Sequence, residues 1–198
     1  MKERIQSIGT ATTIILAINI IAFLLNIFMG GGSLFGLFIS GGGDLKDFRE
    51  LTYAGVIYDH EWWRLITCGY LHVGIIHLTA NVFALLAIGS KMEQRMGSLP
   101  LFVIYHLGIA VTAFLWCLIF RTTSMIGASL GIFVLLGMYV GQMRGNADIK
   151  LSGQERSYLI PYAIIGSLLG VTTAIVHGIG FCVGLLFSFF TAHIFRRQ

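Results

Sequence analysis

The sequence predicts an all-α protein that crosses a membrane about six times. Hydrophobic residues make up 56% of the 198 positions and charged residues only 11%, whereas a soluble domain has roughly 25% charged residues. The mean hydropathy is +0.83. Several uncharged segments are also long enough to cross the roughly 30 Å hydrocarbon layer of a bilayer. These observations favour a polytopic membrane bundle over a soluble globular protein.

Uncharged runs of about one span in length define the expected helices. The first run is longer than the apolar core of a signal peptide, so we interpret it as a retained first helix. The last run comprises about 39 residues, twice what one helix needs, and must hold two helices joined by a tight turn. The expected helices are 10–29, 73–90, 99–120, 125–143, 157–171 and 174–195.

Residues 30–72 differ from these runs and are expected to form a long loop at one membrane surface. The segment contains two Gly-Gly-Gly triplets, which start at Gly30 and Gly41, and most of the acidic residues. It also contains Trp62 and Trp63, and tryptophan is favoured where a membrane meets water. We therefore expect one domain over residues 1–198, with this loop along one face.

The distribution of Lys and Arg predicts the orientation of the helices, because these residues are enriched in cytoplasmic loops. Alternate loops carry nine on one side and four on the other. Both chain ends belong to the richer side, so both termini are expected in the cytoplasm and the 30–72 loop on the outer side. The nine are Lys2, Arg4, Lys91, Arg95, Arg144, Lys150, Arg156, Arg196 and Arg197, and the four are Lys46, Arg49, Arg64 and Arg121.

Ser129 and His177 are candidates for a nucleophile and its general base. Each lies near the start of an expected helix that begins on the outer side. A rise of 1.5 Å per residue places both side chains only several ångströms below that surface. The two residues therefore share a depth in the membrane.

Small residues at four-residue spacing share a helix face with each candidate. Gly137 and Gly141 lie on the face of Ser129, and Gly180 and Gly184 lie three and seven residues after His177. Such stripes allow transmembrane helices to approach closely, because association in lipid depends on packing and interhelical hydrogen bonds. If the two stripes face each other, the serine and the histidine become adjacent. An alternative stays open, in which the stripes serve packing only and the histidine bonds a structural neighbour.

A second polar group comprises His77 and Asn81, which are four residues apart and share one helix face. An imidazole and an amide aimed at the serine would suit a developing oxyanion, and interhelical bonding is their alternative role. His72 lies about 140° around the helix from His77, which is poor geometry for one metal ion. The spans also lack Asp and Glu, which disfavours an aspartyl protease and an ion-coupled transporter. We expect no metal and no cofactor.

The order and spacing of these residues resemble the rhomboid family of intramembrane serine proteases over nearly the whole chain. This resemblance implies a six-helix bundle with a water-filled cavity open to the outer side, in a bacterial plasma membrane. It implies transmembrane proteins as substrates, the lipid bilayer as surroundings, and no nucleic-acid partner. The matching residues are Trp63-Arg64, His72, His77, Asn81, Gly89-Ser-Lys-Met-Glu-Gln-Arg-Met-Gly97, Gly127-Ala-Ser129 and His177-x-x-Gly180-x-x-x-Gly184.

Carried over to this sequence, the resemblance implies that Ser129 is the nucleophile and His177 the general base, without a carboxylate partner. His77 and Asn81, with the backbone N–H of Ser129, would form the oxyanion hole. The helix at 157–171 would be a lateral gate for substrate. The other matching positions have structural roles in the family, and they are Phe133, Arg64, Glu93 and Arg95.

Leu130 departs from the family pattern, which commonly has glycine directly after the serine. A leucine adds bulk and removes backbone freedom there, and we expect its side chain to border the substrate pocket. Two functions therefore stay open, an active serine endopeptidase and a catalytically inactive relative that binds transmembrane helices. The presence of all four dyad and oxyanion residues favours the endopeptidase.

Overall fold

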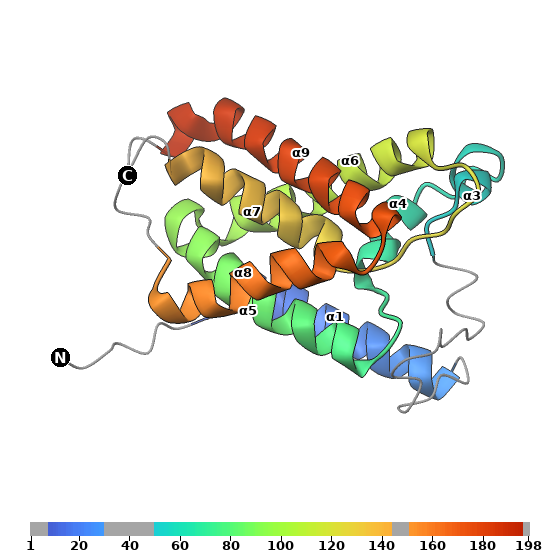
Figure 1. Ribbon diagram of the computed structural model, residues 1–198, viewed down its shortest axis with the longest axis horizontal. Helices are drawn as coiled ribbons and strands as arrows, with labels where there is room; N and C mark the ends of the chain where they lie inside the picture. The colour runs from blue at the N-terminus through green and yellow to red at the C-terminus, as the bar shows by residue number, and fades with distance from the viewer. Residues whose placement is uncertain (1–7, 30–49, 144–150, 196–198) are drawn as a thin grey trace.

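The computed structural model describes residues 8–29, 50–143 and 151–195, and these residues fold almost entirely into helices. The long helices run along the same axis in alternating directions (Figure 1). The start of α1 and the end of α9 lie at one end of the bundle, and α3 and α4 lie at the other. The long helices are α1 (Thr10–Met29), α5 (Ile75–Met96), α6 (Ser98–Ile119), α7 (Ser129–Met143), α8 (Gly153–Leu168) and α9 (Val171–Phe195).

Four of these helices, α1, α5, α6 and α9, are long and apolar enough to cross a membrane. α7 is apolar but has only 15 residues, and α8 carries Glu155 and Arg156 near its start. Large apolar side chains such as Leu99, Phe189 and Phe190 are exposed on the bundle surface. Such a surface suits lipid and not water, so the described residues form a polytopic helical membrane protein.

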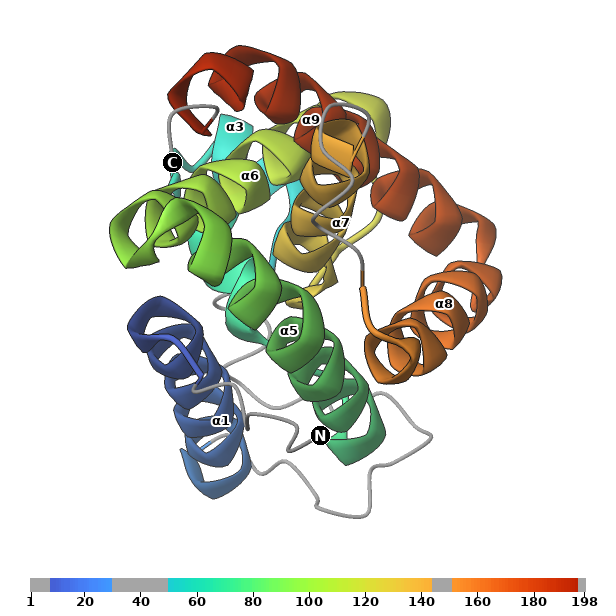
Figure 2. The same cartoon turned by 90° about the vertical axis from the view of Figure 1, so that its left-hand side faces the viewer.

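α7 is the most enclosed of the long helices and lies among α5, α6 and α9 (Figure 2). Every residue from Gly127 to Tyr139 is buried. Its 15 residues extend about 22 Å, less than the hydrocarbon thickness. Because neighbouring helices surround it, this short length exposes little of its backbone to lipid.

The small-residue stripes of α7 and α9 face each other, which is the arrangement that the sequence analysis gave as a condition for Ser129 and His177 to meet. A Cβ atom on Gly137 would lie 2.0 Å from the carbonyl oxygen of Phe181, and one on Gly184 would lie 2.0 Å from that of Val134. No real Cβ atom tolerates such a contact, so the two backbones touch directly at both positions. This approach brings the start of α7 level with the start of α9.

α5 extends to Met96, beyond the expected end at residue 90, because its charged last turn is buried and hydrogen-bonded. The Glu93 carboxylate accepts from the N–H groups of Ala11 and Thr12 at 2.8 Å each. It also accepts from the hydroxyls of Thr12 and Ser98 at 2.6 Å each. The first N–H groups of a helix have no intrahelical partner, so Glu93 caps α1 from a neighbouring helix.

The other helix boundaries differ from expectation where local hydrogen bonds decide them. α7 begins at Ser129 and not at residue 125, because Met125 pairs with Leu51 in an antiparallel bridge. α8 begins at Gly153 and not at residue 157, because Ser152 and Glu155 form a capping box. It ends at 168, three residues early, and α9 starts at 171, three residues before its expected start. α1 matches the expected range and α6 lies within one residue of it.

The expected loop at 30–72 is only partly described, since residues 30–49 lie outside the described residues. The described part is not a peripheral loop, because Leu51, Val56 and Cys68 are fully buried in the core. Arg64 pairs with Glu61 and donates to the Glu50 carbonyl at 2.7 Å, which ties the segment together. It contains the helices α3 (Tyr53–Ile57), α4 (Arg64–Thr67) and the 3-10 helix η1 (Cys68–Tyr70).

We predict that Gly184→Ala destabilises the protein by at least about 1 to 3 kcal/mol, because the new methyl group would overlap the α7 backbone. The matched control is Gly178→Ala on the same helix, where an added Cβ meets nothing within 4 Å. There alanine should be neutral or slightly stabilising, since it favours helix over glycine. Thermal unfolding in detergent compares the two variants, and equal melting temperatures would contradict the close α7–α9 contact.

Candidate active site

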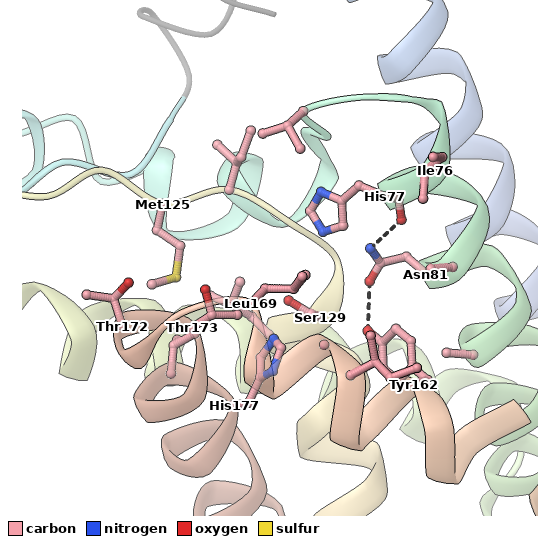
Figure 3. A pocket seen from close by; sticks show the side chains of 18 of the residues that line it. Ile76, His77, Asn81, Met125, Ser129, Tyr162, Leu169, Thr172, Thr173 and His177 are labelled. Atoms are coloured by element: carbon pink, nitrogen blue, oxygen red, sulfur yellow. Dashed lines mark hydrogen bonds between the residues drawn. The ribbon is translucent and has the colours of Figure 1, made fainter. Parts of the chain in front are cut away.

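A cavity of about 840 Å³ lies between α5, α8 and the first turns of α7 and α9. The four predicted site residues, Ser129, His177, His77 and Asn81, all line it. Figure 3 shows their side chains arranged around the same space. The structure therefore brings together residues from three separate helices, up to 100 positions apart in the sequence.

Ser129 is held by the segment that precedes α7 and not by the helix alone. Met125 exchanges two backbone hydrogen bonds with Leu51, at 2.9 and 3.0 Å, and the Gly127 N–H donates to the Cys68 carbonyl at 2.8 Å. These bonds attach the segment to the 50–70 region. Ser129 is 8% exposed, and none of the described residues forms a hydrogen bond with its hydroxyl.

Gly127 allows the His77 ring to approach the serine. Its φ of 135° is a conformation that favours glycine. A Cβ atom there would lie 3.2 Å from Nε2 of His77 and 3.5 Å from Oγ of Ser129. Any larger residue at 127 would fill the space that these two polar groups share.

The His177 imidazole is fixed from two sides. Its ring stacks on Phe133, with centroids 3.9 Å apart and planes 11° from parallel. Its Nδ1 lies 3.2 Å from the Ser167 hydroxyl at the end of α8. His177 is 5% exposed, and the described structure has no direct hydrogen bond between it and Ser129. Catalytic hydrogen bonds are often long without substrate and shorten only when it binds.

Asn81 connects the cavity to α8. Its amide donates to the His77 carbonyl one turn earlier at 2.7 Å. Its amide oxygen accepts from the Tyr162 hydroxyl at 2.9 Å, as Figure 3 shows. Because Asn81 is only 2% exposed, these bonds fix its orientation, while its second amide hydrogen is left for another acceptor.

His72 lies beside His77 and precedes the start of α5 at Ile75. Its ring lies 5.0 Å from that of His77. Burial, together with the nearby His77, lowers the pKa of His72 to about 3. His72 is therefore a neutral imidazole near pH 7 and adds no charge beside His77.

Tyr162 and Ser167 contact the predicted site residues, and no sequence pattern indicates either of them. Both belong to α8, and each bonds a predicted site residue on a different helix. Their spacing along α8 carries no sequence signal, since the contacts depend on how α8 packs against α5 and α9.

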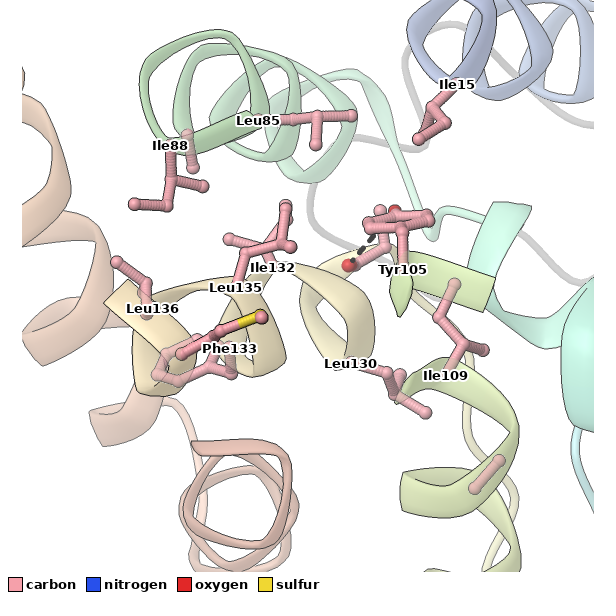
Figure 4. Close-up of a cluster of buried hydrophobic side chains, with 14 of the residues drawn as sticks. Ile15, Leu85, Ile88, Tyr105, Ile109, Leu130, Ile132, Phe133, Leu135 and Leu136 are labelled. Carbon is pink, nitrogen blue, oxygen red and sulfur yellow. Dashed lines mark hydrogen bonds between the residues drawn. The ribbon is translucent and has the colours of Figure 1, made fainter. Parts of the chain in front are cut away.

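The side chain of Leu130 does not point into the pocket as expected. It contributes to the cavity wall, but its side chain is only 1% exposed and packs in the core near Ile109 of α6 (Figure 4). Successive helical residues are about 100° apart, so a serine directed into the cavity turns the next side chain toward α6. Most of the leucine bulk is therefore away from the cavity.

Comparison with known proteins places this arrangement in a family. Residues 59–197 match the rhomboid domain. RHOMBOID-like protein 7 of Arabidopsis thaliana is 29% identical over 150 residues, which cover 73% of this chain and 48% of that protein. Rhomboid protease GluP of Bacillus subtilis (strain 168) is 32% identical over 139 residues, which cover 69% of this chain and 27% of that protein.

A relative described as inactive also matches. Inactive RHOMBOID-like protein 8 of Arabidopsis thaliana is 31% identical over 105 residues, covering 53% of this chain and 30% of that protein. The chain thus spans less than half the length of each of these three relatives. The domain match covers well over half of the chain, and the chain therefore belongs to the rhomboid family.

Proposed function

We propose that the protein is an intramembrane serine endopeptidase that cleaves the transmembrane segments of other membrane proteins. The observation that carries this proposal is the cavity that Ser129, His177, His77 and Asn81 share between the helices. A hydroxyl, an imidazole on a neighbouring helix and two further polar groups are the parts that acyl transfer needs.

The proposed reaction begins when the Ser129 hydroxyl attacks the scissile carbonyl and Nε2 of His177 takes its proton. The oxygen of the tetrahedral intermediate accepts from the Ser129 N–H, which is the first of α7, and from His77 and Asn81. His177 then protonates the leaving amine as the C–N bond breaks. Water repeats these steps on the acyl-enzyme and releases the acid and the free serine.

We further propose that all six long helices cross a bacterial plasma membrane, including the shorter α7 and α8, with both termini in the cytoplasm. The excess of Lys and Arg in one set of loops supports this orientation. The cavity would then open toward the outer side. Trp62 and Trp63, about half exposed near that end, suit the outer interface.

α8 is the proposed gate through which a substrate helix reaches the cavity. It forms one cavity wall, and Ile160, Ile164 and Ile165 are exposed on it. Away from the serine, α8 contacts α5 through stacked Phe83 and Tyr158 rings, 6.0 Å apart. Separation of these two helices would admit a transmembrane segment directly from the lipid.

An inactive, helix-binding protein is the second candidate function. Leu130 after the serine and the similarity to an inactive relative favour it. Retention of the complete set of four polar residues favours the endopeptidase.

We predict that Ser129→Ala and His177→Ala each abolish cleavage of a transmembrane substrate, because attack requires the hydroxyl and its base together. Labelling by a fluorophosphonate in liposomes should also disappear. Ser90→Ala is the matched control, since Ser90 lies on α5 outside the cavity lining. Cleavage by purified Ser129→Ala protein would refute the proposed function.

Asn81→Ala should lower kcat by a factor of up to about 10² with little change in KM, as for loss of one oxyanion donor. Asn19→Ala provides a close control. Asn19 is also 2% exposed and also donates to a carbonyl four residues earlier, at 2.8 Å. Both variants should lose stability, but only Asn81→Ala should lose turnover. Equal kcat values for the two variants would assign Asn81 a structural role.

For Leu130→Ala we predict a loss of about 2 to 5 kcal/mol in unfolding free energy, because truncation leaves a cavity against α6. The preference for residues at the cleavage site should stay unchanged, which a panel of substrates varied at that residue measures. Leu130→Met, which conserves volume, should cost less than about 1.5 kcal/mol. Activity that appears only in Leu130→Gly would identify the natural protein as an inactive relative.

A further inference from the structure

We propose that Ser167 is a positioning residue for the base, and that it fixes the tautomer of His177 in which Nε2 is free to accept the proton of Ser129. This inference rests on the proposed endopeptidase function. The observation behind it is the 3.2 Å contact between the Ser167 hydroxyl and Nδ1 of His177. It would give the dyad a third member, with a hydroxyl in place of a carboxylate.

The Ser167 hydroxyl can donate or accept, so the role of His177 as the base selects the proposed tautomer. A neutral imidazole carries one N–H, and the nitrogen without hydrogen is the base. If Nδ1–H donates to the Ser167 oxygen, Nε2 keeps its lone pair for the nucleophile. The opposite tautomer would place hydrogen on Nε2, and His177 could not accept a proton from Ser129.

The hydrogen bond also complements the other contact of the His177 ring. Stacking on Phe133 at 3.9 Å fixes the plane of the imidazole but is equally compatible with rotation of the ring by about 180° around the Cβ–Cγ bond, which exchanges Nδ1 with Cδ2. A bond at Nδ1 restricts that rotation and so directs Nε2. The stacking contact and the hydrogen bond together define the plane of the ring and the direction in which Nε2 points.

The short connection between α8 and α9 places Ser167 beside His177. α8 ends at Leu168 and α9 begins at Val171, so a short turn separates the two helices. The Ala174 N–H donates to the Gly170 carbonyl at 2.9 Å, so the first hydrogen-bonded turn of α9 starts directly after the end of α8. Ser167 and His177, ten residues apart, therefore meet across the helical hairpin. Gly166 also faces the ring, since a Cβ atom there would lie 3.6 Å from Cε1 of His177.

Because Ser167 belongs to α8, the bond links the proposed gate to the base. Tyr162 on the same helix bonds Asn81 at 2.9 Å. α8 thus contacts the proton acceptor through one hydroxyl and a proposed oxyanion donor through another. A displacement of α8 that admits substrate would act on both groups at once.

The test compares Ser167→Ala, Ser167→Thr and the control Ser90→Ala in liposomes. Ser167→Ala should lower kcat, and the rate of fluorophosphonate labelling, by about three- to tenfold, the effect of losing one uncharged hydrogen bond. KM should stay unchanged. Ser167→Thr retains the hydroxyl and should restore both rates, and Ser90→Ala should match the wild-type protein.

A second readout follows the tautomer directly. Nitrogen-15 NMR of histidine-labelled protein should show His177, assigned by loss of its signal in His177→Ala, as the Nδ1–H form. Ser167→Ala should shift it toward a mixture of tautomers, and Ser167→Thr should not.

Three results would overturn the inference. Unchanged kcat and labelling in Ser167→Ala would show that the bond does not assist the base. Equal losses in the alanine and threonine variants would indicate packing instead of the hydroxyl. An unchanged tautomer in Ser167→Ala would show that the residue does not act through His177. Failure of the proposed function would be recognised separately, because wild-type protein would then show no labelling that depends on Ser129. That result would also overturn the inference.

Discussion

Direct backbone contact between α7 and α9 is the constraint on which the rest of the structure depends. Gly137 and Gly184 allow each helix to lie against a carbonyl oxygen of the other. In a bilayer, lipid tails are as apolar as leucine, so close packing must supply much of the attraction between helices. This contact sets the first turns of α7 and α9 side by side, and with them Ser129 and His177.

The surroundings convert that alignment into a candidate active site. The 50–70 segment holds the turn before Ser129 through backbone bonds to Met125 and Gly127. Phe133 stacks on the His177 ring, and α8 contacts Asn81 through Tyr162 and His177 through Ser167. Neighbouring side chains therefore orient the polar groups of the cavity, and the proposed reaction would need little further reorganisation of them.

The bundle has a buried centre in α7 and a more exposed edge in α8. α7 is buried from Ser129 to Tyr139, and Ser129 is the proposed nucleophile. α8 presents exposed isoleucines and pairs with α5 through Glu155 and Lys91, whose charged atoms lie 3.9 Å apart. A gate helix must move, whereas a catalytic serine must be held in place, and the two proposed roles belong to different helices.

The sequence by itself determined the membrane class and most helix positions, because span length and composition are local properties. The residues that share the cavity were predicted from their spacing together with the family resemblance. The sequence could not determine that Glu93 caps α1, that residues 50–70 are buried, or that Leu130 points toward α6, since each depends on what a distant segment supplies. Tyr162 and Ser167 show the same limit. Their roles exist only because the turn between α8 and α9 places α8 against the cavity, and no pattern within α8 records its neighbours.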